Sequence, residues 1–574
     1  MPFQSAAIFN SPLYKEKVRI MKQVLFFLGV LLMARHALSQ VNTLDRRYVP
    51  VTYKTAARPL FELNVNEWTA YRFDRATKSW SAIPFQFDQL TDTDRYDRNK
   101  DDLTDATDEM IFLPTDTGDK AELSDWITDE MSRQAERIEL QLTDPLNPSK
   151  QGWIYLFKNV MTKPKVQNYI DYIPGPPDQA AADTIVTTAF KLGHSKNGWI
   201  DYLKFTGGKN DFIDRFKLRL KGEGILVPPY EINEDFVQAE TGDDVVAFYP
   251  GPVRLFHISR ADILLEKLNL PIISKPSPFE YNYEYTPYSF AIEAETDIDA
   301  SLLAIFGVRL IRQSLDFNNN AVGMTFYSAN NPNGVLIDGV ATSYSDALNQ
   351  SERENWVMAT GDHGTVFLIF NITIMKNSRR RIYFHDEKNN SNTGDMTQNT
   401  GDSFSIGDMG VMIEATGDAL ITNRLAVTYK GYFIDRANVN FEFGEQLLAW
   451  EQNPLNVTAV LQMYDPTGIV ESEPGPPDDF QLYSTYPNPY HLNSAARIRF
   501  EFGGSVNNLY DIVVYNVIGQ KVVEFKNLAV NANGRHVVLW DARDANGLLT
   551  APGVYFVQLD NGIQTLTQKL IISR

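Results

Sequence analysis

Alternating hydrophobic and polar positions run through most of the chain after its first forty residues. Short runs of this kind occupy residues 70–74 (AYRFD), 137–142 (RIELQL) and 152–157 (GWIYLF). Successive side chains of a strand point to opposite faces, so such runs are typical of strands with one buried face. Turn-forming residues separate the runs at short intervals. We therefore predict an all-β fold, with a multi-domain body of β-sandwich or supersandwich layers.

Helical periodicity is scarce in this sequence. The best candidate is residues 263–268 (ILLEKL), preceded by Asp262 at the N-cap position. A side-chain oxygen at that position accepts a hydrogen bond from a free amide of the first turn. We expect one short helix here, which leaves the all-β assignment unchanged.

Two Pro-Gly-Pro-Pro-Asp segments, at residues 174–178 and 474–478, punctuate the chain. Such segments are stiff and pair poorly with strands, which is typical of linkers. The first is equally compatible with a long hairpin loop, and the second is the more convincing linker. The predicted organisation is a signal region (1–39), an N-terminal β-rich domain (40–170), a central β-rich domain (171–465), a linker (466–481) and a C-terminal domain (482–574).

An apolar run near the N-terminus predicts export. Residues 24–33 (VLFFLGVLLM) follow the basic Lys22 and are too few to span a bilayer, which is typical of a signal peptide. Ala37 and Ser39 are small residues at the positions that a signal peptidase reads, so cleavage is expected between Ser39 and Gln40. We interpret the first twenty residues as an over-long start, with the signal region proper beginning at Met21 and Lys22. No later segment of the sequence is apolar enough to cross a membrane, so we predict no transmembrane anchor.

The net charge and the cysteine content limit the kinds of ligand and metal that the protein can bind. The 574 residues carry a net charge of −19, which argues against a broad basic face for nucleic acid and suits divalent cations. The chain has no cysteine, which excludes disulfides, thiol-ligated metals and thiol nucleophiles. Its stability outside the cell must then come from large cores, and from bound metal if there is any.

The pattern of residues 482–574 predicts a separate, small immunoglobulin-like sandwich. Residues 510–516 (YDIVVYN) alternate as a strand, and a turn at residues 517–520 leads into a returning strand. Residues 534–541 (GRHVVLWD) form another strand, in which Trp540 is expected to be buried. Residues 553–559 (GVYFVQL) form a further strand.

The same stretch resembles a known family. The motifs that carry the resemblance are YPNP (486–489), VVYNVIGQKV (513–522), GRHVVLWDARDANG (534–547), PGVYFVQL (552–559) and QKLII (568–572). Together they resemble the type A C-terminal sorting domain of the type IX secretion system, over residues 486–574. The resemblance implies that the tail engages the type IX secretion machinery, which directs the protein across the outer membrane for surface attachment or release. Such systems belong to Bacteroidota and related bacteria. The alternative is an adhesive sandwich with no role in transport.

The sharpest candidate for chemistry is the acidic segment 97–109 (DRNKDDLTDATDE). Counted from its first residue, oxygen-bearing side chains stand at positions 1, 3, 5, 9 and 12, and position 7 offers a carbonyl, which is the spacing of an EF-hand loop. Two residues depart from that pattern: Asp102 replaces the usual glycine, and Asp108 replaces the usual glutamate. The flanks read as strands, so we predict a structural Ca²⁺ site in a β context, and the alternative is a solvated acidic hairpin. The predicted ligands are Asp97, Asn99, Asp101, Leu103, Asp105 and Asp108.

A second polar stretch, residues 386–408 (DEKNNSNTGDMTQNTGDSFSIGD), is rich in Asn, Asp, Gly and Thr. Such a composition suits either a second ion-binding loop or a surface loop. We favour the surface loop.

Three tyrosines alternate at Tyr281, Tyr283 and Tyr285. On a strand they share one face, where phenol rings can form a platform for sugars. The favoured alternative is that these rings pack across strands inside a sandwich.

Asp362 and His363 lie between two strand-like runs. A loop of this kind can supply an acid/base pair or a metal ligand. The favoured alternative is a structural histidine.

Two functional hypotheses follow for the region before the tail. One is a calcium-stabilised surface protein that binds glycan or matrix, and the other is a secreted carbohydrate-active enzyme, either a polysaccharide lyase or a hydrolase. The sequence contains no Gly-x-Ser-x-Gly, His-Glu-x-x-His, phosphate-loop or dinucleotide motif. We favour binding and leave enzymatic activity open.

Overall fold

The computed structural model describes residues 41–573, apart from 57–58, 92–95, 98–100, 177–181, 209, 224–227, 240–246, 264–276, 297–306, 341–354, 373–377, 389–399, 416–424, 467–479, 484, 486–487, 489, 493–496, 505–508, 531–534, 545–546 and 563–564. The chain divides into two compact units at Pro466 and Thr467. The predicted signal peptide, Asn99 and the second Pro-Gly-Pro-Pro-Asp segment lie outside the described residues.

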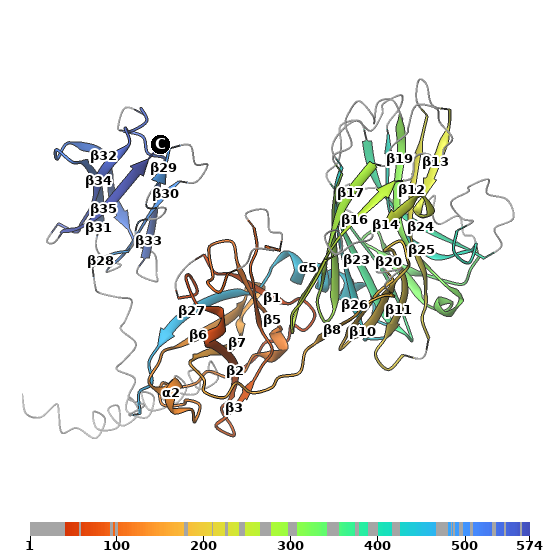
Figure 1. Ribbon diagram of the computed structural model, residues 1–574, viewed down its shortest axis with the longest axis horizontal. Helices are drawn as coiled ribbons and strands as arrows, with labels where there is room; N and C mark the ends of the chain where they lie inside the picture. Colours follow the sequence, from red (N-terminus) through yellow and green to blue (C-terminus); the bar gives the residue numbers. More distant parts are fainter. Residues whose placement is uncertain are drawn as a thin grey trace, which may run out of the picture. The chain divides into compact units, whose positions relative to one another are not determined.

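Strands make up almost all of the described secondary structure, so the all-β prediction is confirmed (Figure 1). The prediction of a helix at 263–268 is wrong for the part of this segment that the structure describes. Asp262 and Ile263 belong to strand β16 (Leu255–Ile263), and residues 264–268 lie outside the described residues.

The N-terminal part of the first unit packs two antiparallel sheets face to face. Its core lies between them and includes Met110, Phe112, Leu140, Ile154 and Leu156. The larger sheet has the order β27-β6-β7-β2-β3 and the smaller one β1-β5-β4. The strands are β1 (Val51–Lys54), β2 (Trp68–Asp74), β3 (Ser79–Ala82), β4 (Gln86–Asp88), β5 (Glu109–Phe112), β6 (Arg137–Asp144), β7 (Asn147–Lys158) and β27 (Asn456–Gln462).

A single buried cation organises the other face of the larger sheet. The guanidinium of Arg137 lies 4.6 Å from the ring centre of Trp126 and 4.8 Å from that of Tyr155. It donates hydrogen bonds to the backbone carbonyls of Asp125 and Glu122 and to the side-chain oxygen of Gln462 on β27. A planar guanidinium can stack and donate at the same time, so this one residue fixes the edge strand to the aromatic cluster.

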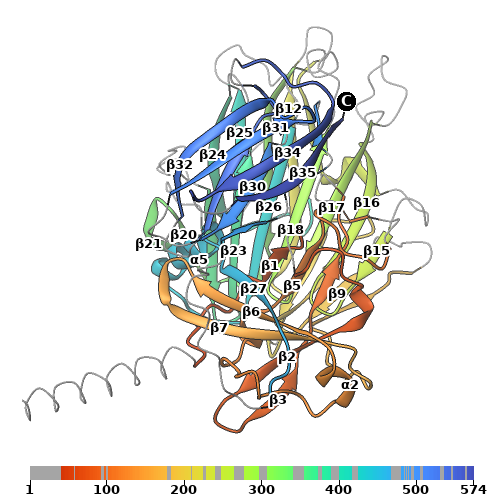
Figure 2. The same ribbon diagram turned by 90° about the vertical axis from the view of Figure 1, so that its left-hand side faces the viewer.

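The central part of the first unit is a larger sandwich in which three sheets share one core. Its largest sheet has ten strands, with the order β14-β16-β17-β18-β26-β23-β22-β20-β21 and β15 paired to β16 (Figures 1 and 2). These strands are β14 (Val237–Ala239), β15 (Ala247–Pro250), β16, β17 (Ser277–Tyr285), β18 (Ser289–Thr296), β20 (Thr325–Ser328), β21 (Asn331–Leu336), β22 (Trp356–Gly361), β23 (Gly364–Ile372) and β26 (Leu425–Ile434).

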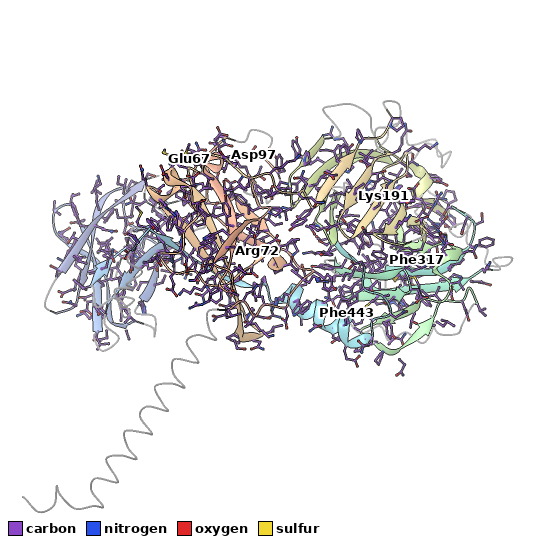
Figure 3. The ribbon with its side chains drawn as sticks, turned by 90° about the horizontal axis from the view of Figure 1, so that it is seen from below. Glu67, Arg72, Asp97, Lys191, Phe317 and Phe443 are labelled. Carbon is purple, nitrogen blue, oxygen red and sulfur yellow. The ribbon has the colours of Figure 1, made fainter. Side chains whose placement is uncertain are left out.

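Two smaller sheets cover the inner face of this sheet. One has the order β13-β12-β19-β25-β24 and the other β11-β10-β9-β8. Phe317 of β19, labelled in Figure 3, is fully buried in the shared core with Phe190 and Phe433. The strands are β8 (Ile170–Ile173), β9 (Thr184–Thr187), β10 (Phe190–His194), β11 (Ile200–Phe205), β12 (Ile213–Gly222), β13 (Tyr230–Asn233), β19 (Val308–Phe317), β24 (Ser378–Glu387) and β25 (Ser405–Ala415).

Helix α5 (Phe441–Gln452) packs on the opposite face of the ten-stranded sheet. Alternate residues of β22 point to the two faces, so Val357 enters the shared core while Trp356 contacts the helix. After α5 the chain returns to the N-terminal part as β27, which pairs with β6. The predicted domain boundary between residues 170 and 171 lies inside the first compact unit and stays a prediction.

The second unit is an immunoglobulin-like sandwich, as predicted. Its two sheets have the orders β28-β30-β33 and β29-β35-β34-β31-β32. Trp540 is buried between them with Phe500 and Val514, which confirms the prediction for that tryptophan. The strands are β28 (Gln481–Leu482), β29 (Tyr490–His491), β30 (Ile498–Gly503), β31 (Leu509–Asn516), β32 (Lys521–Ala529), β33 (Arg535–Trp540), β34 (Gly553–Asp560) and β35 (Thr565–Ser573).

Candidate functional site

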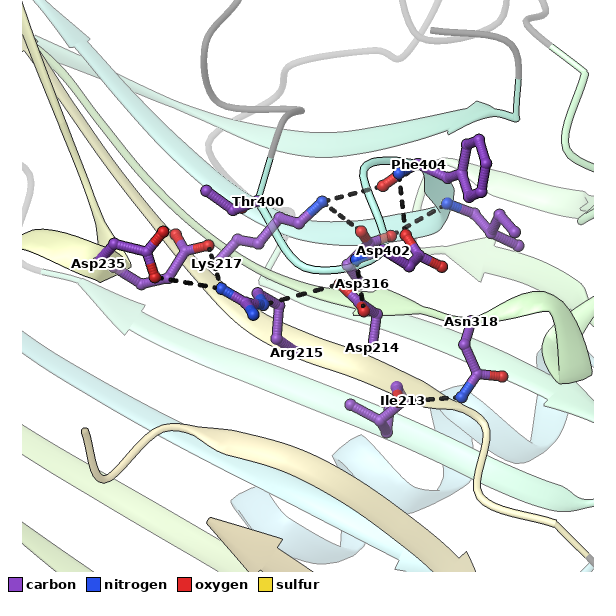
Figure 4. Close-up of polar contacts among 12 residues, drawn as sticks. Ile213, Asp214, Arg215, Lys217, Asp235, Asp316, Asn318, Thr400, Asp402 and Phe404 are labelled. Carbon is purple, nitrogen blue, oxygen red and sulfur yellow. Dashed lines mark hydrogen bonds and ion pairs between the residues drawn. The ribbon is translucent and has the colours of Figure 1, made fainter. Parts of the chain in front are cut away.

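Three carboxylates converge in the five-stranded sheet of the central sandwich (Figure 4). Asp214 comes from β12, Asp316 from β19, and Asp402 from the segment that leads into β25. One carboxylate oxygen of each lies within 4.8 Å of the others. Asp316 is fully buried and the other two are half-buried.

Irregular pairing places two of these acids. The register between β12 and β19 shifts between Ile213 and Arg215, at Asp214. The register between β19 and β25 shifts between Leu315 and Phe317, at Asp316. A bulge changes the direction of a side chain relative to the regular pleat. Both acids thus stand where the pairing is interrupted.

The three carboxylates are held by backbone amides through one oxygen each. The Asp402 amide donates to Asp214 Oδ1 at 3.0 Å, and the Ile406 amide donates to Asp316 Oδ1 at 3.0 Å. The Phe404 amide donates to Asp402 Oδ1 at 2.9 Å. This arrangement fixes the positions of the acids through their Oδ1 atoms, while the second oxygen of Asp316 pairs with Lys217.

Glycine is required beside the cluster. Gly401 has φ +69°, and a Cβ on it would lie 1.9 Å from Asp214 Oδ2. A side chain at this position would have to enter the cluster itself, and the backbone conformation is one that other residues rarely adopt. The close approach of this backbone brings Asp402 to Asp214.

A buried lysine enters the cluster from β12. Lys217 is fully buried, forms an ion pair with Asp316 and donates a hydrogen bond to the carbonyl of Phe404 at 3.1 Å (Figure 4). Burial alone would lower the pKa of Lys217, but the charges of Asp316 and Asp408 outweigh it and raise that pKa. The lysine therefore stays protonated and supplies one positive charge.

The electrostatics of the acids reflect burial and mutual repulsion. Burial, followed by the charge of Asp402, raises the pKa of Asp214 to about 6. Burial also raises the pKa of Asp316 well above its usual range, against the opposing effect of Lys217. The free energy of the ionised cluster would fall if a further positive charge were bound there.

Sequence reasoning did not identify this cluster as a site. Asp214 and Asp316 lie in strands with no local motif around them. Asp402 falls in the polar stretch 386–408, whose composition suits either an ion-binding loop or a surface loop. This composition was the sequence feature that pointed toward the cluster. The described part of the stretch contributes one side of the cluster.

The predicted calcium loop lies in the N-terminal part, where Figure 3 labels Asp97. Asp108 is buried, and its two oxygens accept hydrogen bonds from the amides of Leu90 and Asp105 at 3.0 and 2.9 Å. Asp101 Oδ1 accepts hydrogen bonds from the amide of Leu103 at 2.8 Å and from the side chain of Gln89. These acids therefore act as caps for loop amides.

Convergence of the loop acids is not seen among the residues that the structure describes. No three of Asp97, Asp101, Asp105 and Asp108 bring carboxylate oxygens within 4.8 Å of one another, and Asn99 lies outside that part of the chain. The Leu103 carbonyl accepts a hydrogen bond from Gln89 Nε2 at 2.8 Å. The Ca²⁺ site at residues 97–108 stays a prediction.

The tyrosines at 283 and 285 lie inside the central sandwich. Tyr283 is 2% exposed and Tyr285 is fully buried, which favours the packing alternative over a surface platform. The Tyr285 hydroxyl lies 2.7 Å from His194 Nε2, and His194 Nδ1 contacts Asp183. Tyr281 lies on the same strand, and its side chain lies outside the described part of the structure.

Asp362 and His363 form the two-residue turn between β22 and β23. His363 Nε2 donates to the carbonyl of Asn320 at 2.8 Å, and its ring stacks on Phe212 with centroids 5.4 Å apart. Asp362 is exposed and accepts a hydrogen bond from Asn438 at 2.8 Å. Each side chain has a separate structural partner, which favours the structural reading of the turn.

Comparison with known families identifies the second unit. Residues 484–573 match the secretion system C-terminal sorting domain family, which confirms the resemblance found over residues 486–574. The tail therefore carries the signal for type IX export to the cell surface or the extracellular space. No curated protein matches the chain.

Several solved structures have a distant likeness to the chain. PorZ, an essential surface component of the type IX secretion system of Porphyromonas gingivalis, is 11% identical with a TM-score of 0.14, over 70% of this chain and 51% of PorZ. Latent dimeric PorU from the same organism is 11% identical with a TM-score of 0.14, over 74% of this chain and 35% of PorU. A β-glucuronidase of Faecalibacterium prausnitzii is 8% identical with a TM-score of 0.11, over 46% of each chain. The chain spans about half the length of PorZ, and likeness at this level has no bearing on its activity.

A search of the described residues for membrane spans found no helix of sufficient length and apolar character.

Proposed function

We propose that the first unit is the passenger of the sorting domain and that it binds glycan or matrix at the cell surface or outside the cell, with Ca²⁺ stabilising its fold. The observation that carries the export half of this proposal is the sorting-domain match at residues 484–573. The predicted signal peptide would bring the chain across the inner membrane first.

An aromatic pair supports glycan binding. Tyr96 and Tyr249 stack with ring centroids 4.1 Å apart and an interplanar angle of 23°, and both are half-buried. Tyr96 comes from the N-terminal part and Tyr249 from β15 of the central part, beside the acidic residue Asp97. Partly exposed aromatic rings next to carboxylates suit a sugar, which presents an apolar face and hydroxyl groups.

Two experiments test the proposal. Removal of residues 467–574 should keep the first unit inside the cell, and recovery of the truncated protein at the surface would contradict type IX export. Purified full chain should be retained on polysaccharides, and Tyr249→Ala should reduce retention while the exposed turn variant Asp362→Ala leaves it unchanged. Release of shortened products from the same polysaccharides would instead identify a carbohydrate-active enzyme.

A further inference from the structure

A fourth buried acid accompanies the carboxylate cluster of the central sandwich. Asp408 of β25 is fully buried, and neither of its oxygens has a hydrogen-bond partner among the described residues. The register of β19 with β25 shifts between the pairs Leu315–Met409 and Phe317–Ile406, which flank Asp316 and Asp408. The charge of Asp408 raises the pKa of Asp316. A buried carboxylate with no partner is costly, so the surroundings should provide a positive charge.

Among the described residues, Lys217 and Arg215 are the cations that form ion pairs with the cluster acids. Lys217 compensates Asp316. Arg215 divides its charge between Asp214 at 3.8 Å, Glu234 at 3.5 Å and Asp235 at 3.4 Å. When all four cluster acids are ionised, Lys217 leaves three negative charges, which Arg215 offsets only in part, so a bound divalent cation would reduce the remaining negative charge.

The free atoms are of the type that a hard cation prefers. Asp214 Oδ2 is buried without a hydrogen-bond partner, the amide contacts described above occupy only the Oδ1 atoms, and Asp316 Oδ2 pairs with Lys217. Carboxylate oxygens without histidine or cysteine select calcium or magnesium rather than zinc or copper. The irregular segment around Gly401 suits calcium, which tolerates uneven ligand geometry better than magnesium does.

We infer that Asp214, Asp316 and Asp402 bind a Ca²⁺ ion, with Asp408 adding negative charge beside it. The ion would tie the segment at residues 400–404 to strands β12 and β19, and so close one side of the central sandwich. This inference rests on the proposed stabilising role of Ca²⁺ and assigns that role to this cluster.

Calcium binding to the full chain, stripped of metal with a chelator, tests the inference. Isothermal titration with Ca²⁺ measures affinity and the number of ions, and thermal melting measures the rise in Tm on adding Ca²⁺. Asp402→Asn and Asp214→Asn should weaken binding at this site at least about tenfold and remove its part of the rise in Tm. The control Asp171→Asn, at an exposed strand position of the same sandwich, should retain that part.

Thermal melting in the presence of chelator distinguishes a variant that misfolds from one that has only lost Ca²⁺ binding. Each cluster variant removes one repelling charge, so without Ca²⁺ it should melt at or above the temperature of the unmodified chain. An undiminished Ca²⁺ response in both cluster variants would overturn the inference and leave the stabilising role of calcium standing. A chain that shows no Ca²⁺ response at all would overturn both.

Discussion

The side chain of Asn488 clamps the last strand of the sorting domain, because its Oδ1 accepts a hydrogen bond from the amide of Ile571 at 2.9 Å. Its Nδ2 also donates to the carbonyl of Lys569 at 2.8 Å. The two sequence motifs at either end of the domain, YPNP and QKLII, are therefore joined by one asparagine.

Asn488→Ala should remove both bonds and release β35 from the segment that precedes β29. We expect the free energy of unfolding of the sorting domain to fall by about 1–3 kcal/mol, measured by thermal or denaturant melting, and the exported fraction to fall with it. Asn488→Asp keeps the acceptor for Ile571 and loses the donor, so it should have a smaller effect. Equal stability of all three proteins would contradict this role.

Arg137 should be among the most sensitive positions of the N-terminal part. Arg137→Ala leaves a void among Trp126, Tyr155 and their neighbours and strands the carbonyls of Asp125 and Glu122. We expect a loss of about 3–5 kcal/mol in the free energy of unfolding. Arg137→Lys retains a cation over the rings but not the planar fork, so its loss should be intermediate. Chemical denaturation of the three proteins checks this order.

Asp116 makes the stability of the first unit depend on pH. Burial raises its pKa from 3.8 to about 6, although the Tyr169 hydroxyl donates to it at 2.7 Å. An acid whose pKa is higher in the folded state binds more protons when folded, so the free energy of unfolding falls as pH rises between these two values. The fall is up to about 3 kcal/mol.

Asp116→Asn should remove this component and make the first unit more stable than the unmodified protein above pH about 6, since the neutral amide needs no ionisation. Melting at pH values on both sides of that pKa measures the difference. Asp171→Asn, at an exposed strand position, is the control. A pH profile identical to that of the unmodified protein would show that Asp116 does not carry the effect.

Gly401→Ala tests the close approach inside the acid cluster. Its φ of +69° alone should cost about 1–2 kcal/mol for alanine, and the clash with Asp214 Oδ2 adds to that cost. Gly207 has φ +81° with open space around its Cβ, so Gly207→Ala reports the conformational part alone. A larger loss of Tm for Gly401→Ala than for Gly207→Ala is expected, and equal losses would mean that the backbone moves away freely.

The sequence predicts local structure best where periodicity and turns agree. The runs at 70–74, 137–142 and 152–157 all lie in strands, namely β2, β6 and β7, and the sorting domain follows its motifs closely. Helix α5 was not predicted, because Gly444 in its middle is a poor helix former. A Cβ on Gly444 would lie 3.0 Å from the Trp356 indole. The close packing of the helix on Trp356 therefore favours glycine at this position.

The acid cluster could not be predicted, because its members are distant in sequence and two of them stand at bulges. Asp214 and Asp316 become neighbours only through the pairing of β12 with β19. A one-residue shift in that pairing would move the acids to other positions, and no local pattern specifies the shift. The loop at residues 97–108 has the expected spacing in sequence, yet the acids of its described part cap amides, since short loops satisfy their own backbone first.

Strand β27 makes the N-terminal sheet dependent on the end of the passenger. The partner strand of β6, β27, lies more than three hundred residues later in the sequence. Arg137 of β6 also donates a hydrogen bond to Gln462 of β27. Folding that needs such distant pairing is slow, and a chain cut short before Asn456 would expose β6 as an unpaired edge. The edge of the first sheet is therefore complete only in a chain that has been translated through β27.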